Sequence, residues 1–217
     1  MKDYQHDFLG FAAEIGALRF GTFTLKSGRQ SPYFFNAGLF NTGARLDRLA
    51  SAYAQCIQDA NPAFDVLFGP AYKGIPLAAA TSIALSRSGV RDVAYAFNRK
   101  EAKDHGEGGL VVGSPLVGRI LVIDDVITAG TSVHESMRII QEAGAEPAGV
   151  VIALDRQEQG QDGRSAIAEV TARFGIPVLS LVTLSDLIQY LEDHPAQGAD
   201  AEAVRAYRDR YGVASQA

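Results

Sequence analysis

Two adjacent carboxylates, Asp124 and Asp125, stand between an aliphatic run and a stretch of small and hydroxyl-bearing residues. Residues 120–123 have the composition of a buried strand, and residues 128–132 lead into a pattern that is typical of an amphipathic helix. The first N–H groups of a helix lack intrahelical partners and carry partial positive charge, so this position suits a phosphate. Gly130 lets the backbone approach a ligand closely, and neighbouring hydroxyls add donors. The pattern therefore indicates an anion site directly after a pair of acids.

The two aspartates suit sugar hydroxyls rather than a phosphate, because like charges repel. They can accept hydrogen bonds from a vicinal diol or help to position Mg²⁺. A phosphate site a few residues beyond a diol site fits a ribose 5-phosphate. The alternative is a solvated strand end with Ser132 as an ordinary helix N-cap. For an isolated pair of aspartates we would favour that alternative, but not for the whole run "VIDDVITAGTS". The nucleotide-binding patterns G-x-x-x-x-G-K-[ST] and G-x-G-x-x-G are absent from the sequence.

The elements that must position these residues follow from the hydrophobic pattern. Short apolar strands are predicted at about residues 64–70, 91–100, 118–125, 148–156 and 176–184. Helices are predicted in the first twenty residues and at about 42–60, 75–89, 131–144 and 165–175, and a hairpin at about 22–40. Apolar strands that alternate with helices predict an α/β fold, a doubly wound, mostly parallel sheet with helices on both faces. Ligands bind beyond the carboxyl ends of the strands in such sheets. The tail after Asp193 reads as a last helix with a frayed end, where we expect no chemistry.

Composition narrows the class of protein. The chain has 217 residues, of which 47% are hydrophobic, enough for one sizeable core. Its net charge of -5 argues against a nucleic-acid or membrane-surface binder. Cys56 is the one cysteine and lies at helical spacing among apolar residues, so we expect a packed helix residue and no intrachain disulfide. The N-terminal residues show no signal-peptide pattern, and no apolar run approaches the roughly 20 residues that span a bilayer. We therefore expect a cytoplasmic protein.

The run "VIDDVITAGTS" resembles the phosphoribosyl-pyrophosphate (PRPP) binding motif of type I phosphoribosyltransferases. That resemblance implies a doubly wound core, a mobile catalytic loop and a small N-terminal hood. It also implies Mg²⁺ as the cofactor, bound mainly through PRPP, with Asp124 and Asp125 helping through water and no direct protein ligand assigned. The PRPP-binding residues that it implies are Lys26, Tyr72, Lys73, Arg99, Lys100, Lys103, His105, Asp124, Asp125, Val126, Ile127, Thr128, Ala129, Gly130, Thr131 and Ser132.

Four further stretches resemble one branch of this family, the orotate phosphoribosyltransferases. They are "FTLKSGRQSPYFFNAG", "GPAYKGIPLA", "NRKEAKDHGEGG" and "LDRQEQG", in order along the chain. The resemblance implies that PRPP and orotate give orotidine 5'-monophosphate and pyrophosphate, a step of pyrimidine synthesis. A guanidinium is a fork that can hold the carboxylate of orotate bidentately, which suits Arg156. The orotate-binding residues that the resemblance implies are Lys26, Phe34, Phe35, Thr128 and Arg156. Taken alone, the two phenylalanines would more often be core residues and the arginine a surface charge.

The segment 98–114 is rich in glycine and in charges of both signs. A long glycine-rich loop in a compact domain is usually functional or disordered. As a lid it would bring cations to the leaving pyrophosphate and exclude water; the alternative is a flexible, solubilising linker. In the family this loop reaches the neighbouring subunit's site, which implies a homodimer with shared active sites. The catalytic residues that we assign are Lys26, Lys73, Arg99, Lys103 and His105.

We predict one phosphoribosyltransferase domain over residues 1–217. The hood takes about 1–40 and part of the C-terminal half, the core about 41–185 and the mobile loop about 98–114. Two other functions remain open. A transferase for a purine or uracil would leave Arg156 and Lys26 without a carboxylate partner. A regulatory protein that senses PRPP without turning it over would not need the cations of the loop. It would need a surface that binds nucleic acid, and a pI near 5.4 does not support such a surface.

Overall fold

The structure is a computed structural model that describes residues 1–25, 27–89, 91–103, 109–127, 131–160, 163–195 and 201–213; at residues 102 and 103 it describes the backbone alone. Its centre is a six-stranded sheet with the order β5-β4-β3-β6-β7-β8. The strands are β3 (Val66–Gly69), β4 (Ala94–Lys103), β5 (Gly109–Gly113), β6 (Arg119–Ile123), β7 (Glu146–Asp155) and β8 (Val178–Thr183). All neighbours are parallel except β5, which runs antiparallel to β4 at the edge. The predicted α/β class and the mostly parallel sheet are confirmed.

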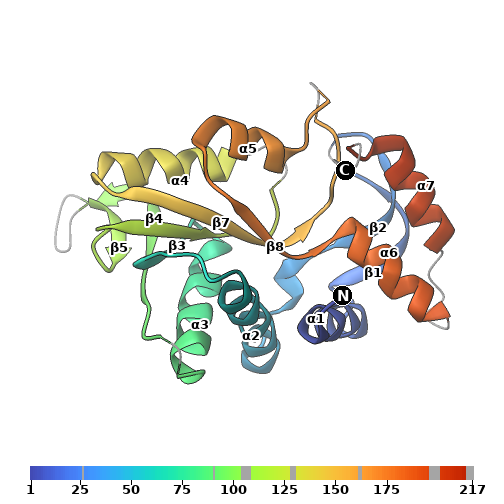
Figure 1. Cartoon of the computed structure of the whole chain (residues 1–217), viewed down its shortest axis with the longest axis horizontal. Coiled ribbons are helices and arrows are strands. Elements are labelled where there is room, and N and C mark those ends of the chain that lie inside the picture. Colours follow the sequence, from blue (N-terminus) through green and yellow to red (C-terminus); the bar gives the residue numbers. More distant parts are fainter. Residues whose placement is uncertain are drawn as a thin grey trace.

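Helices cover both faces of this sheet (Figure 1). Figure 1 shows α2 (Gly43–Ala60) and α3 (Gly74–Arg87) on one face, with α4 (Thr131–Glu142) and α5 (Ala166–Phe174) on the other. The central strands β3, β6 and β7 are buried on both faces, which explains their continuous apolar composition. Their side chains divide between two core clusters, one under α2 and α3 and one under α4 and α5. Cys56 is buried in α2, as predicted.

A smaller body stands beside the sheet and forms the predicted hood. Its hairpin pairs β1 (Leu18–Thr24) with β2 (Gln30–Phe35) in antiparallel register. Around it lie α1 (Asp3–Glu14), the short 3-10 helix η1 (Ala37–Leu39), α6 (Leu184–Asp193) and α7 (Ala201–Tyr211). Figure 1 shows α7 beside β2 and α6 on the outer side of the hairpin, and contacts join α7 to both elements. Among the described residues, no helix combines the length and apolar character needed to span a membrane.

The structure differs from the predicted elements in two places. The long loop expected over 98–114 is, in its described part, an antiparallel pair in which Asn98 lies opposite Val111 and Lys103 opposite Gly109. Polar residues are tolerated there because a strand at the edge of a sheet has exposed faces. Residues 104–108, which connect the pair, lie outside the described residues. The second omission was α6, whose N-terminus is closed by a capping box between Thr183 and Asp186.

Candidate functional site

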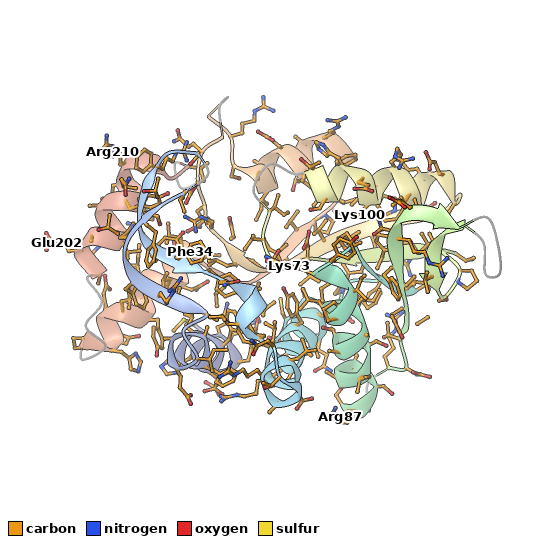
Figure 2. The ribbon with its side chains drawn as sticks, turned by 180° about the vertical axis from the view of Figure 1, so that it is seen from behind. Phe34, Lys73, Arg87, Lys100, Glu202 and Arg210 are labelled. Carbon is orange, nitrogen blue, oxygen red and sulfur yellow. The ribbon has the colours of Figure 1, made fainter. Side chains whose placement is uncertain are left out.

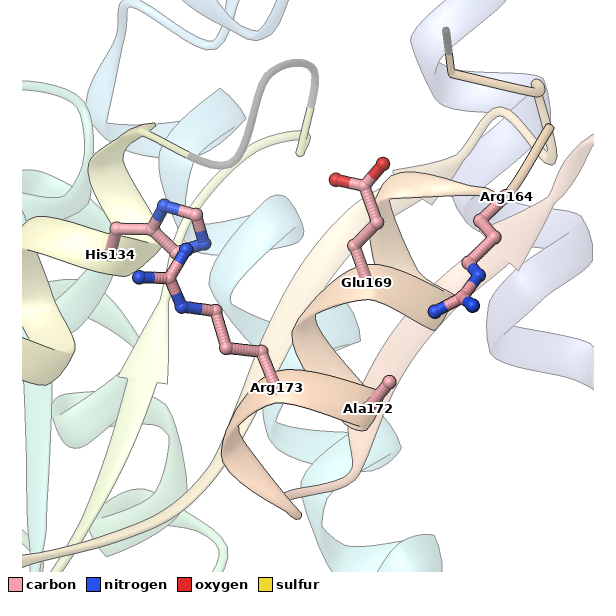
Figure 3. A pocket seen from close by; sticks show the side chains of 5 residues that line it. All are labelled: His134, Arg164, Glu169, Ala172 and Arg173. Carbon is pink, nitrogen blue, oxygen red and sulfur yellow. The ribbon is translucent and has the colours of Figure 1, made fainter. Parts of the chain in front are cut away.

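Many of the predicted residues line one cleft of about 1270 Å³ between the hood and the carboxyl ends of the central strands. Its walls come from the hairpin β1–β2, the loop 70–73 after β3, the residues that follow β6, the end of β7 with the turn 155–160, and the start of α5. In Figure 2, Lys73 lies between Phe34 of the hairpin and Lys100 of β4. This is the edge at which ligands bind in doubly wound sheets. A second, smaller pocket of about 360 Å³ lies along α4 and α5 (Figure 3), and none of the predicted residues lines it.

Asp124 is a buried carboxylate whose oxygens are both occupied by protein donors. Its Oδ1 accepts the backbone N–H of Asp125 at 2.9 Å, and its Oδ2 accepts the hydroxyl of Ser132 at 2.8 Å. Its carbonyl oxygen accepts the hydroxyl of the buried Tyr53 at 2.7 Å. Burial raises the pKa of Asp124 to about 6, against the hydrogen bond from Ser132, which lowers it, and with a smaller increase from the charge of Asp125. The strand end is thus rigidly held before any ligand binds.

Asp125 forms an ion pair with Lys73, the first residue before α3. The Asp125 side chain is 9% exposed, whereas that of Lys73 is 58% exposed. The pair joins the predicted diol site to the predicted pyrophosphate site, because the two residues follow neighbouring parallel strands, β6 and β3. It also keeps the strand end from carrying two uncompensated acids.

A glycine and an asparagine hold the loop 70–73 in place, the glycine through a close backbone approach and the asparagine through a side-chain hydrogen bond. A side-chain carbon at Gly69 would stand 2.0 Å from the carbonyl oxygen of Gly74, so the end of β3 and the start of α3 touch through bare backbone. The amide oxygen of the buried Asn98 accepts the N–H of Ala71 at 2.8 Å. Lys100 lies over the ring of Tyr72, with 4.8 Å between its Nζ and the ring centroid. Asn98 and Tyr53 support the site and were not assigned a role from the sequence.

One wall of the cleft is aromatic. Phe34 and Phe35 both line it, as predicted. The ring of Phe34 lies 5.6 Å from that of Phe23, and Phe35 packs edge-on against the core residue Phe8 at 6.1 Å. Phe35 therefore serves the core and the cleft at once. A flat apolar wall of this kind suits a planar ring.

Arg156 also lines the cleft, but its surroundings correct one sequence argument. We expected that only a ligand would supply its carboxylate partner, and the chain supplies one in Glu158. Arg156 Nε lies 2.8 Å and Nη2 2.6 Å from Glu158 Oε1. Burial disfavours the charge of Arg156, yet Tyr33 and Glu158 together hold its pKa above the ordinary value. A neutral base would therefore not leave this arginine without a carboxylate.

The remaining assigned residues fall into three groups: some line the cleft, three described ones (Arg99, Lys100 and Thr131) are not among its lining residues, and the rest lie outside the described residues. Val126, Ile127 and Ser132 line the cleft, and Thr131 begins α4. Arg99 and Lys100 lie in β4. The residues whose predicted roles fall outside the described residues are Lys26, His105, Thr128, Ala129 and Gly130, together with the side chain of Lys103.

Comparison with known proteins agrees with this geometry. The model of the family described as "Phosphoribosyl transferase domain" matches residues 38–178. An orotate phosphoribosyltransferase of Thioalkalivibrio sulfidiphilus is 61% identical over 213 residues, covering 98% of this chain and 100% of that protein. One of Cronobacter sakazakii is 59% identical over the same shares. The crystal structure of an orotate phosphoribosyltransferase of Francisella tularensis superposes with a TM-score of 0.85 at 44% identity, covering 95% of this chain and 99% of that one.

Proposed function

Because the chain belongs to the phosphoribosyltransferases, and among them to the orotate phosphoribosyltransferases, we propose that it catalyses the Mg²⁺-dependent reaction of orotate with PRPP. The products are orotidine 5'-monophosphate and pyrophosphate, which places the reaction in the synthesis of UMP. One observation supports this most directly. The paired acids after β6, Lys73 after β3 and Arg156 after β7 line a single cleft. Their chemistry suits a ribose, a pyrophosphate and a carboxylate.

In the proposed complex, the acids accept the ribose diol and the segment 126–132 receives the 5'-phosphate. The supports are the burial of Asp124 and Asp125 and the start of α4 at Thr131, where N–H groups lack partners. Both oxygens of Asp124 already hold protein donors, and a carboxylate oxygen has a second lone pair left for a hydroxyl. The sugar would thus be held against a rigid strand end.

The chemical step needs no protein nucleophile. The ring nitrogen of orotate attacks the anomeric carbon, a C–N bond forms, the C–O bond to pyrophosphate breaks, and its electron pair leaves with pyrophosphate. The proton of that ring nitrogen is released to solvent. Cations that face the leaving group lower the barrier most when they are already in place. Lys73 lines the cleft, and we assign it this role of stabilising the leaving group. We assign the same role to Arg99, Lys103 and His105.

Mg²⁺ would supply positive charge to the pyrophosphate oxygens when bound. The donors present fit a site built mainly by the substrate. Among the described residues, no three histidine, cysteine or carboxylate side chains form a cluster able to hold a metal ion. The oxygens of Asp124 and Asp125 are engaged by Ser132, Lys73 and a backbone N–H. Contact through water therefore suits these acids better than direct ligation.

We extend the proposal to the assembly and its location. The described ends of β4 and β5 pair with each other at the edge of the sheet. They flank the segment 104–108, which by the family resemblance reaches the site of a neighbouring subunit. We propose a homodimer in the cytoplasm, in which this segment completes the partner's site.

An ultraviolet assay of orotate consumption tests the function. We expect consumption that requires both PRPP and Mg²⁺, with pyrophosphate and orotidine 5'-monophosphate as products. Uracil, adenine and hypoxanthine serve as alternative bases under the same conditions. Turnover of one of these bases at a higher kcat/KM than orotate, or no turnover of orotate at all, would refute the proposal.

A further inference from the structure

The turn that carries Arg156 is held in an unusual backbone conformation. Its central residue, Gln157, has a φ of 51°, in the left-handed region that a residue with a side chain seldom adopts. Such conformations are unfavourable and persist only where the surroundings impose them, most often at functional sites. Here the conformation brings the side chains of Arg156 and Glu158 together across one intervening residue.

Three separate elements hold Gln157. Its N–H donates to Asp155 Oδ1 at 2.8 Å, at the end of β7. Its side-chain oxygen accepts both the N–H and the hydroxyl of Ser185, in the first turn of α6, at 2.9 and 2.8 Å. Its carbonyl oxygen accepts the N–H of Val213 at 2.9 Å. The last of these contacts comes from the C-terminal segment 201–213, where we expected no chemistry from the sequence.

Glu158 connects the same segment to the guanidinium. Its Oε1 accepts Arg156 Nε and Nη2 and also the hydroxyl of Tyr207 in α7, the latter at 2.8 Å. Burial, and then the hydrogen bond to Glu158, raise the pKa of Tyr207 to about 12, so the tyrosine stays a donor at neutral pH. Main-chain contacts support the arrangement, since Glu158 forms a β-bridge with Gly212. Figure 1 shows α7 packed along the hairpin that forms the cleft's other wall.

The guanidinium of Arg156 is therefore held along the edge formed by Nε and Nη2. Its Nε and Nη2 face Glu158, its plane lies over the ring of Tyr33 with 4.6 Å to the centroid, and Ser31 Oγ stands 3.4 Å from Nη2. Within the described part of the chain, no hydrogen bond occupies Nη1, and the residue lines the cleft. Arg29 also pairs with Glu158, at 3.5 Å, so two guanidiniums share one carboxylate. Arg156, Arg29 and Glu158 together carry a net positive charge, which favours the binding of one more anion.

We propose that Glu158 and Tyr207 are positioning residues for orotate. They hold the Nε edge of Arg156 so that its Nη1 end is presented to the carboxylate of the base. The C-terminal segment 201–213 is thereby part of base recognition. The inference rests on the proposed role of Arg156 as the group that binds that carboxylate. Pre-ordering the fork saves the rotamer entropy that a free arginine would lose on binding.

Steady-state kinetics on the full-length enzyme test the proposal. For Tyr207→Phe, which removes one donor and no charge, we expect KM for orotate to rise roughly five-fold, while kcat and KM for PRPP stay within about two-fold. For Glu158→Gln we expect a rise of roughly ten-fold or more, since a charged anchor is lost. Tyr211→Phe is the matched control. It lies one turn further along α7, and in the described part of the chain its hydroxyl forms no hydrogen bond, so its constants should equal those of the wild type.

The outcomes separate the inference from the function beneath it. If Arg156→Ala raises KM for orotate but Tyr207→Phe and Glu158→Gln leave it unchanged, the positioning role is wrong and the role of Arg156 stands. If Arg156→Ala also leaves it unchanged, the proposed carboxylate site itself fails. A fall of KM in Glu158→Gln would mean that Glu158 only screens charge, and would overturn the proposal. Thermal unfolding of each variant accompanies the kinetics, and Tyr207→Phe decides the question if Glu158→Gln does not fold.

Discussion

Asp124 is the residue at which ionisation and folding are linked most directly. Its pKa is raised to about 6, against about 3.9 for an exposed aspartate, so the folded state binds the proton more tightly than the unfolded state. This contribution to stability is fully present below about pH 4 and is lost as the pH rises through about 6, by up to about 3 kcal/mol. We expect Asp124→Asn to lack this slope.

The measurement is the free energy of unfolding in urea at a series of pH values from about 4 to about 8. The free energy of unfolding of the variant should increase relative to that of the wild type as the pH rises. A difference that stays constant over this range would contradict a buried, titrating Asp124.

Lys103 is the residue on which the proposed electrostatic catalysis can be tested most sharply. Loss of a preorganised charge that faces the leaving group commonly costs about 3–4 kcal/mol of barrier, a factor of about 10²–10³. We expect Lys103→Ala to lower kcat by this factor with little change in the dissociation constant of orotate. Lys2→Ala, which removes an exposed surface pair with Asp59, is the control. Normal turnover by Lys103→Ala would refute its catalytic role.

At the scale of elements, the contact between the end of β3 and the start of α3 sets the shape of the loop 70–73. A side-chain carbon at Gly74 would meet Pro70 Cδ at 2.6 Å and the backbone of Gly69 at 2.7 Å. The backbone cannot yield as a flexible side chain would, so we expect Gly74→Ala to destabilise the fold by about 1–3 kcal/mol. Displacement of the loop should also raise KM for PRPP roughly tenfold.

A matched control exists for this change. Gly43 is the first residue of α2, as Gly74 is of α3, and a side-chain carbon there meets nothing within 4 Å. Gly43→Ala should leave both stability and KM for PRPP near the wild-type values. If the two variants have the same thermal stability and the same KM for PRPP, the close approach between β3 and α3 does not determine the shape of the loop.

The same scale shows what the sequence could predict. The strands β3, β6 and β7 were predicted because both of their faces are buried, which makes their composition continuously apolar. The pairing of β4 with β5 was missed because the second half of β4 is polar and β5 is a short apolar run between glycines, so composition did not separate the pair from a loop. The helix α6 was missed although Thr183 and Asp186 form a readable capping signal.

At the scale of the whole molecule, the site residues fall into two groups. Asp124, Lys73 and Arg156 could be placed at one edge, because parallel strands end together and each residue lies within four residues of the end of a strand. Tyr207 could not, because its contact with Glu158 spans 49 residues and depends on how α7 packs against the hairpin. Sequence patterns report local structure, whereas the support of a functional side chain is set by packing between elements.

The proposed sharing of sites between two copies makes a quantitative prediction. Lys103→Ala inactivates the segment that a subunit contributes to its partner's site. Arg156→Ala inactivates the cleft of the subunit's own site. In a hybrid dimer of the two inactive variants, one site combines both defects and the other has neither. With random exchange half of the dimers are hybrids, so an equal mixture should recover about a quarter of the wild-type activity per subunit. Each variant mixed with itself is the control. If exchange is verified and no activity returns, each chain completes its own site.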